Sequence, residues 1–436
     1  MDKLRIIGGT PLSGRITVGG AKNAALPLLC AALLTSEKVT FDNVPYLADI
    51  TTLAKLLRQH GVAFSMQDMG SDTLFANTGS EGVYSRRVIL HAETITNVTA
   101  PYELVSTMRA SILVLGPLLA REGRAKISLP GGCAIGARPV DMHLQAMQAL
   151  GAEITLEEGY VLAAAPKGGL VGAEIFFDKV SVGATENALM AATLARGTSI
   201  IHNAAREPEI GDLAELLNAM GAQISGMGTS TLTIQGVSSL TGAHHRVIAD
   251  RIETGTYLAA VALAGGELAI HDTRADALEV VINLLCEMGV SIRQDGTILH
   301  VAHDGSPLRP MELTTEPHPD FPTDMQAQLM TLLTNAQGIS RITETIFENR
   351  FMHVPELGRM GADIRIEGNT ATIHGPTRLK GAPVMATDLR ASVSLVMAAL
   401  AAQGETTISR IYHLDRGYER LEEKLALCGA NIVRIR

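Results

Sequence analysis

One short motif recurs six times along the chain and constrains what it can fold into. A glycine ends a helical stretch and precedes an alternating one, and it stands at Gly61, Gly151, Gly221, Gly289, Gly361 and Gly429. The steps between these glycines are 90, 70, 68, 72 and 68 residues. Glycine after a periodic apolar run is typical of a helix C-terminus, and apolar–polar alternation is typical of a strand. The motif therefore predicts six copies of a helix-to-strand junction.

A second, more apolar helix is predicted in every copy. These segments are rich in Ala, Leu and Ser and cover residues 24–34, 108–120, 185–195, 254–264, 325–336 and 389–402. They are apolar on nearly all sides, which is typical of buried helices. Strands after the glycine motif often come in pairs, and turn residues such as Asp295-Gly296 predict hairpins. The sequence therefore predicts an α/β fold of six helix–strand–helix–strand–strand repeats of about 70 residues.

Length and repeat number together predict two domains of three units each. A chain of 436 residues exceeds the size at which one hydrophobic core stops growing. The last unit is one strand short, so we expect N-terminal strands at 4–7 and 15–18 to join the C-terminal half. The predicted domains are 22–248, and 1–21 with 249–436. The first step is longer than the others, and the polar, glycine-containing residues between Ser65 and Leu90 predict a surface insertion.

Composition excludes several classes of function. The net charge of −9 argues against binding to nucleic acid or to an anionic membrane. With no Trp, 8 Phe and 7 Tyr, platforms for stacking bases are scarce. The N-terminal residues lack the apolar core of a signal peptide, and the uncharged apolar runs fall short of the ~20 residues that span a bilayer. We therefore expect a cytoplasmic protein without membrane segments.

Cys133 lies in the segment most suggestive of chemistry, Pro130-Gly131-Gly132-Cys133-Ala134-Ile135-Gly136-Ala137-Arg138-Pro139. Its glycines and prolines disfavour helix and central strand, which indicates a loop with a thiol at its tip. A nearby guanidinium lowers a thiol pKa and attracts anions. The alternative is an ordinary buried cysteine. The remaining cysteines, Cys30, Cys286 and Cys428, fall on apolar helical stripes, so we expect them in the core.

Basic residues recur at the starts of predicted buried helices or on nearby loops. They are Lys22, Arg109, Arg350, Arg390 and Arg416. Helix N-termini and cations both attract anions, so this recurrence indicates a polyanionic ligand between the two halves; the alternative is a set of ordinary surface charges. Asp250, Asp324 and Asp388 also precede helices, where each is either a cap or a general base. The histidines have no metal-ligand spacing, and we expect neither a metal nor a cofactor.

Longer stretches in order along the chain carry a family resemblance. They are residues 19–25, 107–111, the Cys133 segment, 178–185, 203–209, 250–255, 321–328, 347–350, 386–390 and 415–420. In these stretches the chain resembles the enolpyruvyl transferase family, specifically the UDP-N-acetylglucosamine 1-carboxyvinyltransferases. The resemblance implies a two-domain inside-out α/β barrel. It also implies transfer of the enolpyruvyl group of phosphoenolpyruvate to the 3-hydroxyl of UDP-N-acetylglucosamine, with release of phosphate, as the first committed step of peptidoglycan synthesis.

The same resemblance implies which residues bind the two substrates. Those for phosphoenolpyruvate are Lys22, Asn23, Arg138 and Arg416. Those for the nucleotide sugar are Arg109, Arg138, Pro139, Val140, Asp141, Met142, Lys179, Val180, Ser181, Val182, Asp324 and Ile346. Arg350, Asp388 and Arg390 complete the implied cleft.

The expected mechanism gives Cys133 and Asp324 the proton transfers. Cys133 delivers a proton to the enol and is also a candidate for a covalent adduct, while Asp324 takes the proton of the sugar hydroxyl. The residues leave open whether Cys133 acts mainly as acid or as nucleophile. Because such a thiol invites alkylation, the resemblance also suggests sensitivity to the epoxide fosfomycin. The rival readings are 3-phosphoshikimate 1-carboxyvinyl transfer, an RNA 3′-phosphate cyclase and a non-enzymatic repeat scaffold.

Overall fold

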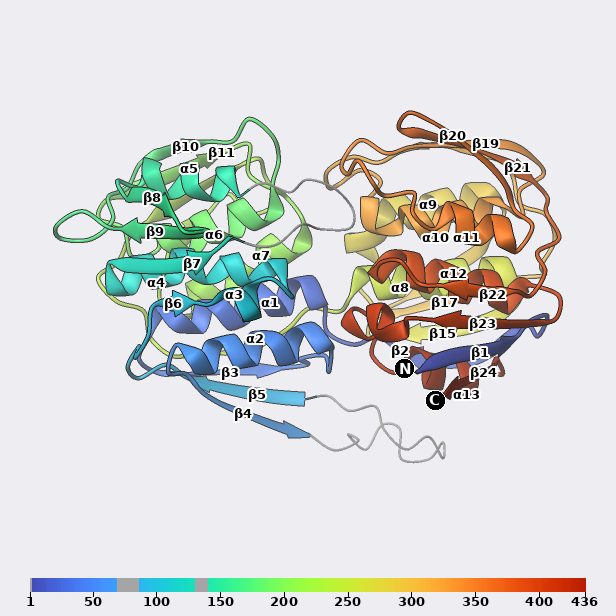
Figure 1. The fold of residues 1–436 in the computed structure, drawn as a ribbon, viewed down its shortest axis with the longest axis horizontal. Helices are drawn as coiled ribbons and strands as arrows, with labels where there is room; N and C mark the ends of the chain where they lie inside the picture. Colours follow the sequence, from blue (N-terminus) through green and yellow to red (C-terminus); the bar gives the residue numbers. More distant parts are fainter. Residues whose placement is uncertain (1, 69–85, 130–139) are drawn as a thin grey trace. The chain divides into compact units, whose positions relative to one another are not determined.

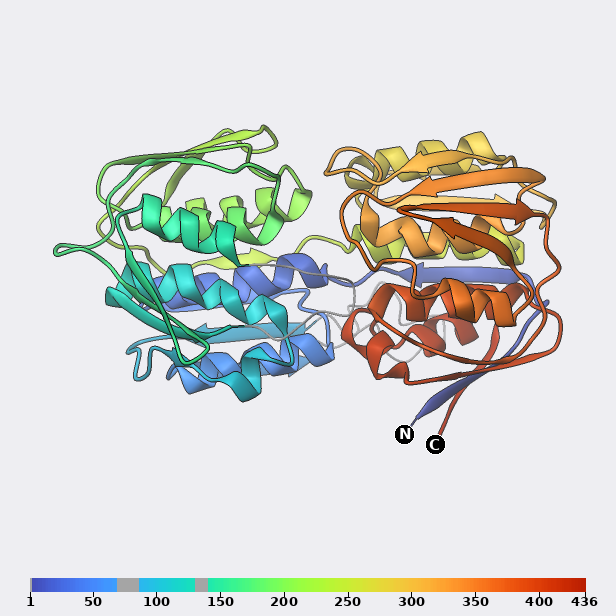
Figure 2. The ribbon, with the colours of Figure 1, turned by 45° about the horizontal axis from the view of Figure 1, so that its top comes forward.

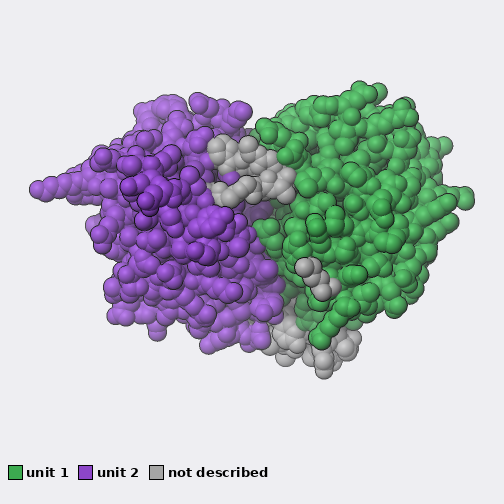
Figure 3. Space-filling view, in the orientation of Figure 1, with its two compact units in different colours: residues 1–19, 134–137, 249–436 green, residues 20–133, 138–248 purple. Residues whose placement is uncertain are grey.

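A computed structural model describes residues 2–68, 86–129 and 140–436. Its chain divides into two compact units, coloured differently in Figure 3. Residues 20–248, without the two undescribed stretches, form what is called here the N-terminal unit. Residues 2–19 and 249–436 form the C-terminal unit.

Each unit contains three four-stranded sheets among its described residues. In the N-terminal unit the strand orders are β14-β3-β5-β4, β6-β7-β9-β8 and β10-β11-β13-β12. The strands are β3 (Lys38–Asp42), β4 (Ala63–Asp68), β5 (Arg86–His91), β6 (Thr99–Ala100), β7 (Arg124–Ser128), β8 (Glu153–Glu157), β9 (Tyr160–Ala164), β10 (Glu174–Phe176), β11 (Thr198–His202), β12 (Gln223–Ser225), β13 (Thr231–Gln235) and β14 (His244–Arg246).

The C-terminal unit repeats this topology with orders β22-β23-β1-β24, β16-β17-β15-β2 and β18-β19-β21-β20. Its strands are β1 (Lys3–Ile7), β2 (Leu12–Thr17), β15 (Gly266–His271), β16 (Ser291–Asp295), β17 (Ile298–His303), β18 (Glu312–Thr314), β19 (Gly338–Thr343), β20 (Asp363–Glu367), β21 (Thr370–Gly375), β22 (Pro383–Met385), β23 (Glu405–Ser409) and β24 (Asn431–Ile435). The N-terminal strands belong here, since β1 pairs with β23 and β24, and β2 runs parallel to β15.

Within each unit the helices lie inside and the sheets outside (Figures 1 and 2). Most strands bury alternate residues, so one face of each sheet packs on helices and the other faces solvent. The helices buried on nearly all sides are α1 (Lys22–Ala31), α6 (Val182–Ala192), α8 (Arg251–Ala264), α10 (Gln326–Leu333) and α12 (Leu389–Ala401). Their few charged residues cluster near the first turn, as in α1, α8 and α12.

The other helices bury one side or are short. They are α2 (Ala48–Gln59), α3 (Tyr102–Val105), α4 (Leu115–Glu122), α5 (Asp141–Ala149), α7 (Pro208–Ala219), α9 (Glu279–Met288), α11 (Val354–Arg359) and α13 (Leu421–Leu427). Short 3₁₀ turns are η1 (Ala32–Leu34), η2 (Arg109–Val114), η3 (Ala275–Leu278), η4 (Thr323–Met325) and η5 (Ile411–Arg416). All six motif glycines have φ between 90° and 111°, the left-handed conformation that ends a helix and favours glycine.

Two expectations need correction. Residues 65–68 and 86–90 are not a surface insertion but paired strands of one sheet, β4 with β5, because alternate apolar residues such as Val88 and Leu90 reach the core; residues 69–85 lie outside the described part. Cys286 is exposed, because it lies on the outer side of α9, whereas Cys30 and Cys428 are buried as expected. No helix in the described residues is long and apolar enough to cross a membrane.

Candidate active site

Cys133, Arg138 and Pro139 lie outside the described residues. The other predicted site residues are divided between the two units. In the described part of the chain, no cluster of His, Cys, Asp or Glu has the arrangement of a metal site.

Asp324 is the centre of the charged cluster in the C-terminal unit. It lies in η4, immediately before α10, and both of its carboxylate oxygens accept bonds from guanidinium groups. Arg350 Nη2 lies 2.6 Å from Oδ1, and Arg390 Nη2 lies 2.9 Å from Oδ2. The two arginine side chains are 5% and 6% exposed, whereas that of Asp324 is 25% exposed. The interpretation of Asp324 as a helix cap is therefore wrong, because its carboxylate bonds side chains instead of the N–H groups of α10.

Arg350 and Arg390 form a clamp on Asp324 and fix the charge of its carboxylate. Burial alone raises the pKa of its carboxyl, but Arg390 and Arg350 outweigh burial and hold that pKa well below 3.8. Asp324 is therefore ionised at neutral pH and is a weak base while both arginines hold it. Two guanidinium groups and one carboxylate leave a net charge of +1, which favours an anionic ligand beside Asp324.

Asp388 caps α12, which is one of the two roles expected from its position before a helix. Its carboxylate accepts bonds from the N–H groups of Arg390 and Ala391 at 2.9 and 3.0 Å, so it fixes the start of α12. Asp250 caps α8 in the same way, through the N–H groups of Ile252 and Glu253. Asp388 thus orients the helix turn that carries Arg390.

Arg416 ends η5 and is half-buried. The neighbouring Asp415 pairs with Arg434, whose Nη2 lies 2.6 Å from Asp415 Oδ1. The pKa of His413 is lowered first by burial and then by Arg416, while Asp388 raises it. Gly417, the residue after Arg416, packs on Leu389, the residue after Asp388, so Arg416 and Asp388 lie in the same part of the unit.

Ile346 is 37% exposed and follows β19. Its N–H donates to Glu344 Oε1 at 2.8 Å, and the Phe347 N–H donates to the same oxygen at 3.1 Å. The other oxygen, Glu344 Oε2, accepts from Thr323 Oγ1 at 2.9 Å. Buried Glu344 therefore joins the loop of Ile346 to the residue that precedes Asp324.

Lys22 begins α1 in the N-terminal unit, and Asn23 follows it. Lys22 Nζ lies 2.8 Å from Asp49 Oδ2, with the two side chains 13% and 5% exposed. The preceding residue, Ala21, provides no side-chain cap for the first N–H groups of α1. A helix start that carries a lysine and has no side-chain cap at its N-cap residue is suited to an anion.

The remaining predicted residues of this unit lie around the starts of other helices. Val140, Asp141 and Met142 begin α5, Lys179 to Val182 lead into α6, and Arg109 begins η2. Ser181 caps α6 by accepting the Ala184 N–H. Buried His143 joins α5 to α6, since its Nδ1 lies 3.1 Å from Asn187 Nδ2. The helices that begin at these two stretches, α5 after residues 140–142 and α6 after residues 179–182, therefore contact each other.

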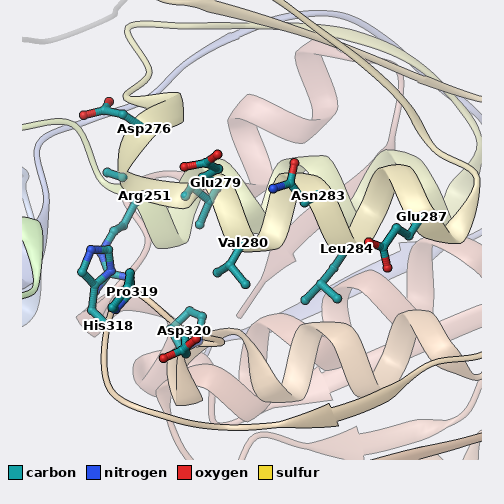
Figure 4. A pocket seen from close by; sticks show the side chains of 13 residues that line it. Arg251, Asp276, Glu279, Val280, Asn283, Leu284, Glu287, His318, Pro319 and Asp320 are labelled. Atoms are coloured by element: carbon teal, nitrogen blue, oxygen red, sulfur yellow. The ribbon is translucent and has the colours of Figure 1, made fainter.

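A pocket of about 330 Å³ lies in the C-terminal unit between α9 and residues 318–322 (Figure 4). Among the described residues its charged lining is mostly acidic, from Asp276, Glu279, Glu287 and Asp320, and it also includes Arg251. Val280 and Leu284 project from the side of α9 on which His318 and Pro319 lie. None of the predicted site residues that the structure describes lines this pocket, and four carboxylates disfavour a phosphorylated ligand there.

Relatives with curated names match the chain from end to end. A protein of Agrobacterium fabrum is 59% identical over 436 residues, and one of Rhizobium meliloti is 56% identical over 435 residues, with all of both chains covered in each case. Both are named UDP-N-acetylglucosamine 1-carboxyvinyltransferase. The chain belongs to this family.

Broader comparisons agree with the UDP-N-acetylglucosamine 1-carboxyvinyltransferase assignment. The model of the EPSP synthase (3-phosphoshikimate 1-carboxyvinyltransferase) family matches residues 6–425. The enolpyruvyl transferase NikO of Streptomyces tendae is similar with a TM-score of 0.86 and 27% identity, covering 99% of this chain and 98% of the other. EPSP synthase of Acinetobacter baumannii, with a TM-score of 0.73, 18% identity and 100% of both chains covered, shares the fold. The predicted family and the inside-out α/β barrel are confirmed.

The sequence patterns predicted no site role for two buried groups that support the Asp324 cluster: Glu344, and His353, which was expected to be a structural or surface histidine. Glu344 was hidden in a polar run after a strand, and no motif distinguishes it. His353 is fully buried in this unit, and burial lowers its pKa to about 4, against the opposing effect of Asp388 and with a further lowering by Arg350. At neutral pH the His353 ring is therefore uncharged, with the Asp388 carboxylate and the Arg350 guanidinium as its charged neighbours.

The buried His353 predicts a loss of stability in acid. Its folded-state pKa lies below the unfolded value of 6.5, so its contribution is complete above pH 6.5 and is lost as pH falls toward 4. The expected loss is about 3 kcal/mol of unfolding free energy. Denaturant titrations across this range should show a steeper decline for the wild type than for His353→Asn. If the unfolding free energies of the wild type and of His353→Asn declined in parallel, the lowered pKa of His353 would be contradicted.

Proposed function

We propose that this chain transfers the enolpyruvyl group of phosphoenolpyruvate to the 3-hydroxyl of UDP-N-acetylglucosamine, with release of phosphate, in peptidoglycan synthesis. The observation that carries the proposal is the full-length match, at 56–59% identity, to relatives named for this activity. The charged cluster around Asp324 supports it, because it joins a carboxylate to buried cations that suit an anionic substrate.

The proposal assigns the cations to substrate binding. Lys22, Asn23, Arg138 and Arg416 bind phosphoenolpyruvate, while Arg350, Asp388 and Arg390 complete the site. The nucleotide sugar is assigned to Arg109, residues 138–142 and 179–182, Asp324 and Ile346. Guanidinium groups suit phosphate and carboxylate because they form paired hydrogen bonds.

Asp324 is assigned as the base for the sugar hydroxyl. In the clamp its pKa is too low for effective proton abstraction. An anionic substrate that draws Arg350 or Arg390 away raises this pKa, because the carboxylate then loses a neutralising partner. The base thus gains strength when an anionic substrate is bound beside these arginines.

Cys133 is assigned as the acid. A proton adds to the methylene carbon of the enol while the hydroxyl oxygen bonds to the adjacent carbon. Phosphate then leaves with the bridging oxygen as the new methyl group loses a proton. This restores the carbon–carbon double bond and gives the enol ether of the sugar. As a nucleophile, the sulfur would instead add to that same carbon and give an adduct that retains phosphate. Intact-protein mass spectrometry distinguishes the two roles, because only the adduct increases the mass of the chain.

The acceptor is tested by supplying phosphoenolpyruvate with either UDP-N-acetylglucosamine or 3-phosphoshikimate. We expect phosphate release with the nucleotide sugar and none above background with 3-phosphoshikimate. Release with 3-phosphoshikimate alone would replace the proposed function by the activity named in the family model.

Lys22 provides a further test. Replacing it with methionine should raise the KM for phosphoenolpyruvate by about tenfold or more, since a charge-assisted bond is worth roughly 1.5–3 kcal/mol. Lys22→Arg keeps the charge beside Asp49 and should retain more affinity. Lys55→Met, an exposed position on α2, is the matched control. Equal KM values for Lys22→Met and Lys55→Met would remove Lys22 from the site.

A further inference from the structure

Tyr418 lies two residues after Arg416 and is 2% exposed. It belongs to the stretch 415–420, yet neither the sequence patterns nor the proposed mechanism gives it a role. Its hydroxyl reaches three buried helices of the C-terminal unit, α8, α10 and α12, through hydrogen bonds to one residue of each.

The hydroxyl of Tyr418 uses its full hydrogen-bonding capacity. Thr256 Oγ1 donates to the Ile252 carbonyl at 2.7 Å, so it must accept the proton of Tyr418 Oη, 2.9 Å away. The two lone pairs of Tyr418 Oη then accept from Gln328 Nε2 and Arg390 Nη1, each at 3.3 Å. A buried phenol with one donor and two acceptor sites filled is held in a single orientation.

Arg390 is consequently held at two ends. Its Nη2 bonds Asp324 and its Nη1 bonds Tyr418, while its guanidinium carbon lies 5.7 Å from the centre of the Tyr418 ring. Without the phenol oxygen, the guanidinium would keep its bond from Nη2 to Asp324 but would lose the bond that fixes Nη1. The tyrosine therefore sets the direction from which Arg390 approaches Asp324.

The backbone connects the same phenol to Arg416. The N–H groups of Gly417 and Tyr418 both donate to the Leu414 carbonyl at 3.0 Å, which closes the turn around Arg416. A Cβ at Gly417 would lie 2.5 Å from Leu389 at the start of α12, so this turn packs closely on that helix. The fixed side chain of Tyr418 thus holds one end of a tight turn that carries Arg416.

We propose that Tyr418 is a positioning residue for the two anion-binding arginines, orienting Arg390 through its hydroxyl and Arg416 through the adjoining turn. The inference rests on the proposed function, because it assumes that Arg416 binds phosphoenolpyruvate and that Arg390 completes the same site. It gives Tyr418 a role in affinity for that substrate, distinct from affinity for the nucleotide sugar.

Tyr418→Phe removes only the hydroxyl and tests the proposal by a split between two KM values. We expect the KM for phosphoenolpyruvate to rise about tenfold, since a bond to a charged group is lost, while the KM for UDP-N-acetylglucosamine stays within about twofold. Thr256→Val removes the acceptor of the phenol proton without touching the arginines. It should give a smaller rise in the same KM.

Tyr257→Phe is the matched control. Tyr257 is also a fully buried tyrosine of this unit, but its hydroxyl donates to Glu253 Oε1 at 2.8 Å instead of orienting an arginine. Tyr257→Phe should lower the midpoint of thermal unfolding without raising the KM for phosphoenolpyruvate relative to that for UDP-N-acetylglucosamine. A phosphoenolpyruvate KM unchanged in Tyr418→Phe, or raised equally in Tyr257→Phe, would overturn the role of Tyr418. Wild-type protein with no phosphate release on adding UDP-N-acetylglucosamine would instead overturn the proposed function, and this inference with it.

Discussion

Replacing Asp324 with asparagine is expected to lower kcat by about a thousandfold, within the range of 10²–10⁴ attributed to a general base. The amide has nearly the shape of the carboxylate but cannot take the proton of the sugar hydroxyl. It also removes the charge that neutralises Arg350 and Arg390, whose side chains are 5% and 6% exposed. The unfolding free energy should therefore fall by about 3–5 kcal/mol, as when one partner of a buried pair is removed. Steady-state kinetics and denaturant titration measure the two effects.

Asp320→Asn is the control for this substitution. Asp320 lies four residues earlier, is exposed and lines the acidic pocket, so the same chemical change there should leave kcat and stability nearly unaltered. If Asp324→Asn kept more than about a tenth of the wild-type kcat, the residual activity would be above what loss of a general base allows. Asp324 would then be a structural partner of the arginines only.

Replacing Cys133 with alanine is expected to abolish both turnover and labelling by the epoxide fosfomycin. The expectation comes from the glycine-rich, arginine-containing segment around Cys133, which lies outside the described residues. Alanine removes the only group to which the proposed mechanism gives proton delivery. The loss of turnover should therefore approach the level of the uncatalysed background.

Cys286→Ala is the matched control for thiol chemistry. Among Cys30, Cys286 and Cys428, Cys286 alone is exposed, so a general alkylating reagent should reach it. Burial raises the pKa of Cys30 and raises that of Cys428 to about 11, which keeps both as unreactive thiols. Epoxide labelling should persist in Cys286→Ala and vanish in Cys133→Ala. Full turnover in Cys133→Ala would remove that thiol from the mechanism.

Local patterns were enough to predict the repeated fold. The glycine steps located each helix-to-strand junction because glycine is favoured at positive φ, and all six positions adopt it. The apolar segments located the buried helices, since a helix without a polar face has no other stable place. The exposed Cys286 was missed because α9 also carries apolar residues that are only partly buried, Ile282 and Leu284, and sequence alone does not rank the apolar sides of such a helix.

The site was less predictable because its contacts are distant in sequence. The bonds of Asp324 reach Arg350 and Arg390, 26 and 66 residues away, and no spacing rule links such positions. Asp388 and Asp250 do cap helices, whereas Asp324 in an equivalent place does not. That difference arises from the guanidinium groups that the fold brings to Asp324. Tyr418 has three distant partners and gives no local signal at all.

The bridging oxygen of phosphoenolpyruvate provides the most direct test of enolpyruvyl transfer. With that oxygen isotopically labelled and UDP-N-acetylglucosamine as acceptor, transfer of the enolpyruvyl group breaks the carbon–oxygen bond. Mass spectrometry should therefore find all of the label in the released phosphate and none in the enolpyruvyl ether of the sugar. Label retained in pyruvate, or a phosphorylated sugar as product, would show cleavage of the phosphorus–oxygen bond and contradict the account.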